Sequence, residues 1–243
     1  MSKRVILITG ANGGLGQAIA RAFLEEAPQN MVVLGVRQRR DQAEQLAQAF
    51  AGRASCLPLD VTEPAAWEAA LARILDVHGR LDVLVNNAGF HEDALLGTMP
   101  TDSWRRVLAA NLDSVFHGCQ AVLPTMISQR QGRIINIASL SALLAPAGQA
   151  NYAAAKAGVV ALTRSLAKEV ARIGITVNAL CPGYIESPQL TGLSEEARRA
   201  ALARVPMRRF GRPEEVAAVV RFLACPDAGY ITGSAIKIDG GIL

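Results

Sequence analysis

The sequence predicts one α/β domain, with a doubly wound, seven-stranded and mainly parallel sheet that carries helices on both faces. Short apolar runs alternate with longer amphipathic runs along the whole chain. The strand candidates are apolar at consecutive positions, as parallel strands buried on both faces are. No Pro/Gly/Ser-rich linker, charge run or repeat divides the 243 residues. We therefore expect a single domain over residues 1–243.

Four strands alternate with three helices in the first part of the chain. The strand candidates contain the runs VILI, VVL and VLV, and the third helix starts with Pro64, in the first turn where proline is tolerated. In order, the patterns predict a strand over 4–9, a helix over 15–26, a strand over 31–36, a helix over 41–50, a strand over 54–59, a helix over 64–77 and a strand over 81–85.

The second part continues the alternation. The patterns predict a long helix over 101–123, a strand over 132–137, a helix over 151–173, a strand over 175–180, helices over 194–204 and 213–223, and a last strand over 235–238. One irregular stretch, residues 181–192, holds two prolines and two glycines after a strand end. Such a stretch is typical of a functional loop, and we expect the substrate loop near 184–207.

Composition excludes several classes of protein. A hydrophobic content of 51% with a net charge of 25 − 21 = +4 excludes a disordered chain and shows no basic stripe typical of a nucleic-acid binder. No run of about 18 apolar residues predicts a membrane span, and the N-terminal apolar stretch is too short for a signal peptide. The four cysteines lack disulfide or metal-site spacing, which predicts reduced thiols, a cytoplasmic protein and no metal site.

A glycine-rich turn follows the first strand and opens the first helix. It runs Thr9-Gly10-Ala11-Asn12-Gly13-Gly14-Leu15-Gly16. Glycines let the backbone approach a pyrophosphate, and the helix N-terminus offers free N–H groups and a partial positive charge. The context predicts a dinucleotide site. An ordinary strand-to-helix turn is the alternative.

Tyr152 and Lys156 are four residues apart in a predicted helix, so both project from one face. A nearby ammonium favours the phenolate form of tyrosine. Lowering the pKa of Tyr152 to near neutrality requires about 4 kcal/mol. Tyr152 could then exchange a proton with a carbonyl or alcohol oxygen, with the Ser139 hydroxyl holding that oxygen. The alternatives are an interface tyrosine with a solvated lysine, and Ser141 in place of Ser139.

These residues together resemble the motifs of the short-chain dehydrogenase/reductase family, and the resemblance covers nearly the whole chain. The spacing T-G-x-x-x-G-x-G, Asn86-Asn87-Ala88-Gly89 and Pro182-Gly183 match family motifs. The resemblance implies a Rossmann fold that binds a nicotinamide dinucleotide. It implies a catalytic tetrad of Asn111, Ser139, Tyr152 and Lys156, and cofactor contacts from Gly10, Asn12, Gly13, Gly14, Leu15, Gly16, Arg37, Asp60, Val61, Asn87, Ala88, Gly89, Tyr152, Lys156, Pro182, Gly183 and Ile185.

Asn111 leaves two roles open. Its side-chain amide either satisfies backbone groups at a helix irregularity or anchors a water chain to Lys156, and the resemblance implies the second role. The three residues between Tyr152 and Lys156 favour carbonyl and alcohol chemistry, because the enoyl reductases that resemble this fold use a wider spacing.

Arg37 is expected where the second strand meets the adenine ribose of the cofactor. An acidic residue there binds the 2′-hydroxyl of NAD, whereas arginine accommodates the 2′-phosphate of NADP. Arg39 and Arg40 follow, and no acid occurs before Asp41. We therefore predict NADPH as the cofactor. Gly13 departs from many NADP-dependent relatives, which carry a basic residue there, and a solvated basic turn is the alternative.

Several segments outside the tetrad resemble the family's 3-oxoacyl-(acyl-carrier-protein) reductase subgroup, including residues 148–158, 174–187 and 228–241. This implies NADPH-dependent reduction of a 3-oxoacyl thioester in fatty-acid or polyketide-type biosynthesis. The alternatives are a dehydrogenase of a sugar, polyol or other secondary alcohol and, more remotely, a non-catalytic dinucleotide sensor.

The resemblance also implies a homotetramer, with the two long helices over 101–123 and 151–173 as a candidate dimer surface. An acidic acyl carrier protein would need a basic docking face. The candidates near the active-site helices are Arg130, Arg133, Lys168 and Arg172, for which a solubilising surface is the alternative. We expect no nucleic-acid or membrane partner.

Overall fold

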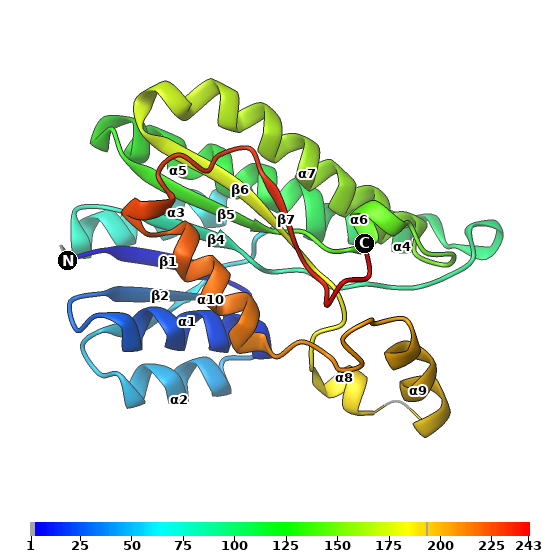
Figure 1. Cartoon of the computed structure of the whole chain (residues 1–243). Helices are drawn as coiled ribbons and strands as arrows, with labels where there is room; N and C mark the ends of the chain where they lie inside the picture. Colours follow the sequence, from blue (N-terminus) through cyan, green and yellow to red (C-terminus); the bar gives the residue numbers. More distant parts are fainter. Residues whose placement is uncertain (1–2, 193) are drawn as a thin grey trace.

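The computed structural model describes residues 3–192 and 194–243. Its seven strands form one sheet in the order β3-β2-β1-β4-β5-β6-β7, and every neighbouring pair is parallel (Figure 1). The predicted doubly wound α/β fold is therefore confirmed, with a sheet that is parallel throughout. The strands are β1 (Val5–Thr9), β2 (Met31–Val36), β3 (Ala54–Pro58), β4 (Val83–Asn86), β5 (Gly132–Ile137), β6 (Ile175–Pro182) and β7 (Ala235–Ile238).

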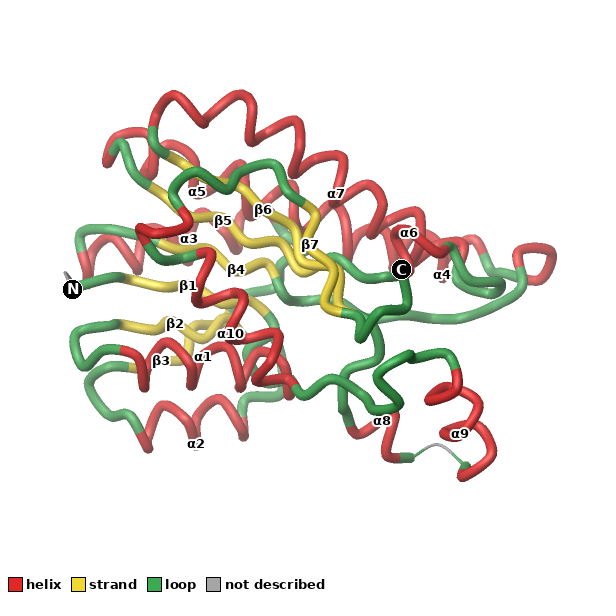
Figure 2. Tube along the Cα trace, viewed as in Figure 1, coloured by secondary structure: helices red, strands yellow, loops and turns green. Residues whose placement is uncertain are grey.

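Helices cover both faces of the sheet (Figures 1 and 2). The core residues of α1 (Gly14–Glu26), α2 (Asp41–Ala49) and α10 (Pro213–Leu223) pack on one face. Those of α3 (Pro64–His78), α5 (Ser114–Gln129) and α7 (Ala150–Val170) pack on the other. Successive residues of β1 alternate between these layers, with Val5 and Leu7 in one and Ile6 and Ile8 in the other. This explains the unbroken apolar runs, because both faces exclude water.

The predicted helix over 101–123 is interrupted and longer than expected. It consists of α4 (Thr101–Leu108), a π-helical segment η2 (Ala109–Asp113) and α5, which continues to Gln129. Pro124 lies inside α5, on its exposed side, and does not end the helix. The helix ends at Arg130, whose φ of 53° is left-handed. A π-helical turn adds one residue to the repeat, which shifts the side chains that follow around the helix axis.

Several short helical turns were not predicted. They are α6 (Ser141–Leu144), α8 (Pro188–Thr191), and the 3₁₀ turns η1 (Leu96–Thr98) and η4 (Pro226–Ala228). The end of the predicted helix over 151–173 is a separate 3₁₀ turn, η3 (Ala171–Ile173), which follows α7. The stretch over 181–192 is only partly irregular, because β6 runs through Pro182 and α8 follows. Within the predicted substrate loop, α9 covers Glu195–Ala203, and residue 193 lies outside the described residues, as do residues 1 and 2.

The order of the strands creates a crevice at one edge of the sheet. The chain leaves β1 for β2 on one side and returns at β4 on the other, so the connections diverge where β1 and β4 lie side by side. Ligands of open α/β sheets bind at this point, beyond the carboxyl ends of the strands. Across the described residues, no helix combines the length and apolar character needed to cross a membrane. All four cysteines are free thiols.

Candidate active site

The predicted site residues gather at the carboxyl edge of the sheet. Gly10 follows β1, Arg37 follows β2, Asn87 follows β4 and Ser139 follows β5. Gly183 follows β6, and the amide of Leu140 donates to the carbonyl of Pro182 at 2.9 Å. Residues that are far apart in sequence therefore meet at one edge because all the strands point the same way.

The glycine turn is closely packed between β1 and α1. Gly10 has a φ of +64°, and a Cβ on Gly16 would stand 2.6 Å from the carbonyl oxygen of Gly10. Such a separation is not tolerated, so only glycine fits at Gly16. Gly14 has open space around it, and α1 starts with no side-chain cap and no acidic residue in its first turn. Its first N–H groups are therefore left for an anion.

Thr9 and Asn87 join the turn to the end of β4. The Thr9 hydroxyl accepts hydrogen bonds from the amides of Asn87 at 2.9 Å and Ala88 at 3.0 Å. The Asn87 side chain donates to the carbonyls of Thr9 at 2.9 Å and Gly10 at 3.3 Å. The crevice is thus braced across the two central strands. Sequence reasoning placed Thr9 at the start of the glycine-rich motif but did not predict its hydrogen bonds to the end of β4.

A cleft of about 430 Å³ opens along this edge. It joins the open side of the glycine turn to the ends of β2, β3 and β4, and these residues fit a dinucleotide. Of the predicted cofactor residues, Leu15 is half-buried and Gly16 is buried behind the turn, away from the cleft wall. The lining residues are Gly10, Asn12, Gly13, Gly35, Val36, Arg37, Gln38, Arg39, Leu59, Asp60, Val61, Thr62, Ala88, Gly89, Phe90 and Ala110.

Asn12 has a structural task in this cleft. Its side-chain oxygen accepts from the amides of Gln42 at 3.0 Å and Ala43 at 3.1 Å, and so it caps the start of α2. Its amide nitrogen lies 3.3 Å from a carboxylate oxygen of Asp41. Asn12 thereby fixes the glycine turn against the helix that follows β2.

Arg37 and Asp60 face each other at the end of the cleft beyond β2 and β3, with 3.7 Å between Nη1 and Oδ2. Burial raises the pKa of Asp60, but hydrogen bonds from Thr62 and the charge of Arg37 outweigh it, so the pKa lies below its usual value. Arg37, Arg39 and Arg40 are all exposed. Three guanidinium groups therefore stand where the chain leaves β2.

Ser139, Tyr152 and Lys156 meet beyond the ends of β5 and β6. The Ser139 hydroxyl is a hydrogen-bond partner of Tyr152. Lys156 Nζ lies 5.6 Å from the centre of the Tyr152 ring and donates to the carbonyl of Ile137 at 2.8 Å. Lys156 is buried, and this burial lowers its pKa to about 8. The group combines a hydroxyl, a phenol and a desolvated ammonium within one small region.

The Tyr152 phenol differs from expectation. Burial raises its pKa above the usual value, the Ser139 hydroxyl lowers it in part, and the charge of Asp93 raises it further. The expected lowering by Lys156 is therefore not present in the chain by itself. The ammonium lies over the face of the Tyr152 ring, 5.6 Å from its centre.

Asn111 lies in the π-helical segment η2 and is fully buried. Its Nδ2 donates to the carbonyls of Phe90 at 2.7 Å and Val107 at 2.8 Å. The structure thus shows the role in which the amide satisfies backbone groups at a helix irregularity. Its Oδ1 has no hydrogen-bond partner among the residues that the structure describes. A Cβ on Gly89 would lie 2.4 Å from Asn111 Oδ1 and 3.5 Å from Lys156 Nζ, so both polar atoms approach Gly89.

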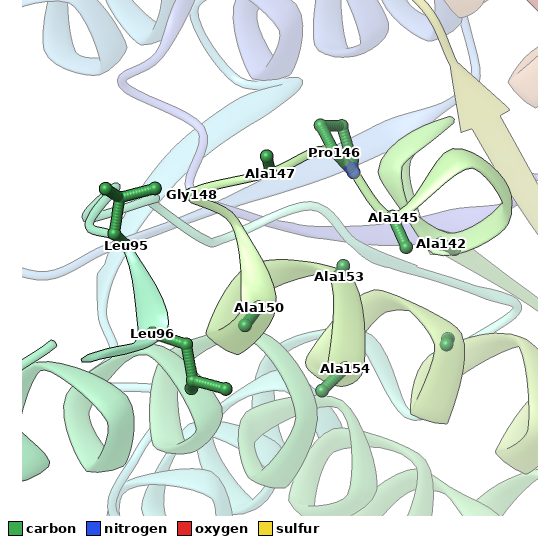
Figure 3. A pocket seen from close by; sticks show the side chains of 11 residues that line it. Leu95, Leu96, Ala142, Ala145, Pro146, Ala147, Gly148, Ala150, Ala153 and Ala154 are labelled. Atoms are coloured by element: carbon green, nitrogen blue, oxygen red, sulfur yellow. The ribbon is translucent and has the colours of Figure 1, made fainter. Parts of the chain in front are cut away.

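A second pocket, of about 520 Å³, lies beside the start of α7 and is apolar (Figure 3). Leu95 and Leu96 form one side, and the turn from Ala145 to Gly148 and the first two turns of α7 form the other. Leu95 and Leu96 are more than half exposed. Sequence reasoning did not predict this pocket.

Comparisons with known proteins define the class of the chain. A family profile described as "Enoyl-(Acyl carrier protein) reductase" matches residues 10–243. The chain belongs to the short-chain dehydrogenase/reductase family, whose members use a nicotinamide dinucleotide.

Among curated proteins, the chain is similar to several that are named 3-oxoacyl-[acyl-carrier-protein] reductase FabG. It is 44% identical to that of Vibrio cholerae serotype O1, over 98% of this chain and 97% of the relative. It is 43% identical to that of Thermotoga maritima, over 99% and 98%. It is 41% identical to that of Escherichia coli K12, over 98% and 97%.

Proposed function

We propose that the chain is an NADPH-dependent reductase that converts a 3-oxoacyl thioester into the 3-hydroxyacyl thioester in fatty-acid or polyketide-type biosynthesis. The observation that carries this proposal is the meeting of Ser139, Tyr152 and Lys156 beside the cleft at the start of α1. The curated relatives at 41–44% identity support the thioester substrate.

The bound nicotinamide would supply a hydride to the ketone carbon, and the residues of the chain act on the oxygen. Ser139 positions the ketone oxygen by a hydrogen bond, and Tyr152 gives that oxygen its phenol proton. The buried ammonium of Lys156 stabilises the negative charge that remains on Tyr152. Because Lys156 gives one of its three protons to Ile137, two remain for the ribose of the cofactor.

Tyr152 must regain its proton after each turnover. Asn111 Oδ1 is a buried acceptor without a partner, and it approaches Gly89 from the same side as Lys156 Nζ. A water molecule held between these groups would satisfy the oxygen and connect Lys156 to solvent. We propose this supporting role for Asn111.

The description of the matching family profile names an enoyl reductase, so a second activity must be compared. The three residues between Tyr152 and Lys156 favour carbonyl reduction, and the curated relatives above carry the 3-oxoacyl reductase name. An enoyl thioester tested beside the 3-oxoacyl thioester separates the two activities.

The test is NADPH oxidation with an acetoacetyl thioester, run beside NADH, the enoyl thioester and a panel of simple ketones. We expect turnover of the acetoacetyl thioester with NADPH and little with the enoyl compound. Turnover of simple ketones or sugars without any thioester activity would contradict the proposed substrate.

The preference for NADPH rests on Arg37, Arg39 and Arg40 at the adenine end of the cleft. Replacing Arg37 by Gln removes one charge-assisted contact to a 2′-phosphate, which should raise the KM for NADPH about tenfold and leave that for NADH unchanged. Arg73→Gln is the matched control, because Arg73 is exposed on α3, away from the cleft. Equal effects of Arg37→Gln on both cofactors would contradict the preference.

We propose a homotetramer. Two separate sets of large apolar side chains are exposed, which suits the two different two-fold interfaces of such an assembly. Phe116 and Ile127 are exposed on α5, and Phe222, Tyr230 and Leu243 are exposed on α10 and the C-terminal segment. Light scattering of the purified protein tests this assembly, and a monomer at micromolar concentration would exclude it.

The predicted docking residues for an acyl carrier do not lie near Tyr152 in the same chain. Arg130, Lys168 and Arg172 are exposed where α5 and α7 end, roughly 24 Å from Tyr152 along α7. Arg133 is half-buried and donates to the carbonyls of Gly132 and Gly174, so it supports the backbone instead. We propose that the exposed three serve the cleft of another subunit.

A second basic segment lies closer to the cleft. Residues 194–212 carry six arginines and two glutamates, a net charge of 6 − 2 = +4. The double variant Arg130→Glu with Arg172→Glu should raise the KM for a carrier-linked substrate, and Arg199→Glu with Arg204→Glu should not. The opposite result would place carrier docking on residues 194–212.

A further inference from the structure

The segment that follows β4 is fastened to the start of α7. The amide of Ala94 donates to the carbonyl of Gly148 at 2.9 Å, and the Asn151 side chain donates to the carbonyl of Glu92 at 3.0 Å. Asn151 itself is fully buried. These bonds join residues more than 50 positions apart, so the side chains of residues 91 and 93 stand in fixed places beside Tyr152.

A chain of hydrogen bonds runs from this segment to Ser139. His91 Nδ1 lies 3.1 Å from Asp93 Oδ1, and Gln149 Nε2 donates to Asp93 Oδ2 at 2.9 Å. Ser141 Oγ donates to Gln149 Oε1 at 2.9 Å, and the amide of Ser141 donates to Ser139 Oγ at 3.1 Å.

The two ends of this series of hydrogen bonds, Ser139 and His91, both contact Tyr152. Ser139 is the hydrogen-bond partner of Tyr152, and the His91 ring packs edge-on against the Tyr152 ring with 6.0 Å between their centres. The two groups assigned to the ketone oxygen are therefore held by one connected set of side chains.

The carboxylate fixes the direction of these bonds. An ionised Asp93 can only accept, so His91 Nδ1 carries a proton and Gln149 turns its amide nitrogen toward Asp93. The amide oxygen of Gln149 then faces Ser141. Because Ser139 Oγ accepts from the amide of Ser141, its own proton remains available for a phenol or ketone oxygen.

We propose that Asp93 is a positioning residue for the proton transfer at Tyr152, acting through Gln149 and Ser141 on Ser139 and through His91 on the phenol ring. The inference rests on Tyr152 as the proton donor of the proposed function, and it does not depend on which carbonyl compound is the substrate.

The charges around Tyr152 indicate how Asp93 affects the protonation of the phenol. Lys156 lies over the ring, Asp93 and His91 lie on the segment after β4, and the next carboxylate, Glu92, is paired with Arg106 of α4 at 2.8 Å. Burial raises the pKa of Tyr152, Ser139 lowers it, and Asp93 raises it again. A charged Asp93 therefore keeps the proton on Tyr152, and the protonated phenol is the form that gives a proton to a ketone oxygen.

The test compares Asp93→Asn with Glu92→Gln, which removes the same charge one residue away. The measurement is the pH profile of kcat/KM for reduction and for oxidation of the product alcohol. Without the charge of Asp93, Tyr152 ionises more readily, so both profiles should move toward lower pH by about half a unit or more. Glu92→Gln should leave them in place. Profiles of Asp93→Asn that superimpose on the parent would overturn the proposal.

A second variant, Gln149→Leu, interrupts the same series of hydrogen bonds without changing the charge of the protein. We expect a several-fold loss of kcat with little change in KM for the cofactor, and no such loss would refute the link from Asp93 to Ser139. A readout independent of turnover is the phenolate absorbance of the cofactor-free protein during alkaline titration. The chain has three tyrosines, and subtraction of the Tyr152→Phe titration isolates Tyr152.

These outcomes separate the inference from the proposed function. If the parent reduces another carbonyl but no thioester, the substrate proposal fails and the pH profiles still test Asp93. If it reduces nothing, the absorbance titration alone decides. A Tyr152 transition unchanged by Asp93→Asn would overturn the inference in either case.

Discussion

Tyr152 is the proton donor of the proposed reaction, and removal of its phenol oxygen tests this role. Tyr152→Phe removes the phenol proton and keeps the ring between Lys156 and His91. We expect turnover to fall by about a thousandfold or more, as for loss of a general acid, while NADPH affinity measured by fluorescence titration stays near that of the parent. Tyr230→Phe, at a fully exposed tyrosine, is the control. Persistent turnover of Tyr152→Phe would exclude the mechanism.

Lys156 provides a stability test of its burial. Its pKa is about 8 in the folded chain and 10.5 in a model peptide, so below pH 8 the fold carries the full cost of a buried charge. That shift corresponds to about 3 kcal/mol. Between pH 8 and 10.5 the folded chain loses the proton while the unfolded chain keeps it, so this cost disappears as pH rises.

Lys156→Met removes this cost and leaves the Ile137 carbonyl without its donor, a loss of about 1 kcal/mol. The cofactor-free variant should be more stable than the parent by about 2 kcal/mol at pH 7, and the gain should vanish by pH 10.5. Urea unfolding at the two pH values measures both. A variant that is less stable by the same amount at each pH would contradict the argument.

At the scale of elements, two glycines of the turn between β1 and α1 differ in how closely they are packed. Gly16→Ala places a Cβ 2.6 Å from the Gly10 carbonyl and 2.8 Å from Ala11 Cα, and both neighbours are backbone. We expect a loss of about 2 kcal/mol or more in stability, because neither neighbour can move without disturbing β1. Gly14→Ala enters open space in a helix and should be neutral or slightly stabilising. Thermal unfolding of both cofactor-free variants decides, and equal losses would show that the turn is not tightly packed.

The sequence predicted elements well where their signals are local. The bounds of β2, β5, α10 and β7 match the predicted ranges, since each is an apolar run between clear breaks. A helix irregularity at Asn111 was one of two open alternatives, and the π-helical form and the bond from its side chain to the Phe90 carbonyl, 21 residues away, became visible only in the structure. The predicted helix over 101–123 ends too early, because α5 continues through Pro124 to Gln129.

In the candidate site, too, residues with a local sequence signal were predicted and those that depend on distant contacts were not. Motif spacing identified the glycine turn, Ser139, Tyr152 and Lys156. Asp93 and Gln149 were given no role from the sequence, and they meet only because β4 and α7 bring together residues 56 positions apart. The direction of the Tyr152 pKa was wrong for the chain alone, because burial, which a sequence does not display, raises this pKa.

At the scale of the whole molecule, charge and substrate size make a further prediction. The net charge of +4 equals that of residues 194–212 alone, so the rest of the chain is balanced overall. Attraction of an acidic carrier to Arg130, Lys168 and Arg172, the docking residues proposed above, should weaken as salt shortens the range of their charges. The KM for a carrier-linked substrate should rise several-fold between low and physiological ionic strength, whereas that for a short neutral thioester should not. Parallel changes in both would argue against electrostatic docking.

Backbone hydrogen bonds hold the two ends of the predicted substrate loop together. The amide of Glu186 donates to the carbonyl of Gly211 at 2.8 Å, and the amide of Gly211 donates to the carbonyl of Tyr184 at 2.9 Å. Ile185 and Gly211 pair as an isolated parallel bridge outside the sheet. The stretch between them is therefore a separate loop whose two ends are held together by these hydrogen bonds. Its length and side chains could be exchanged for those of another reductase, transferring substrate preference while the seven strands and the dinucleotide cleft stay as they are.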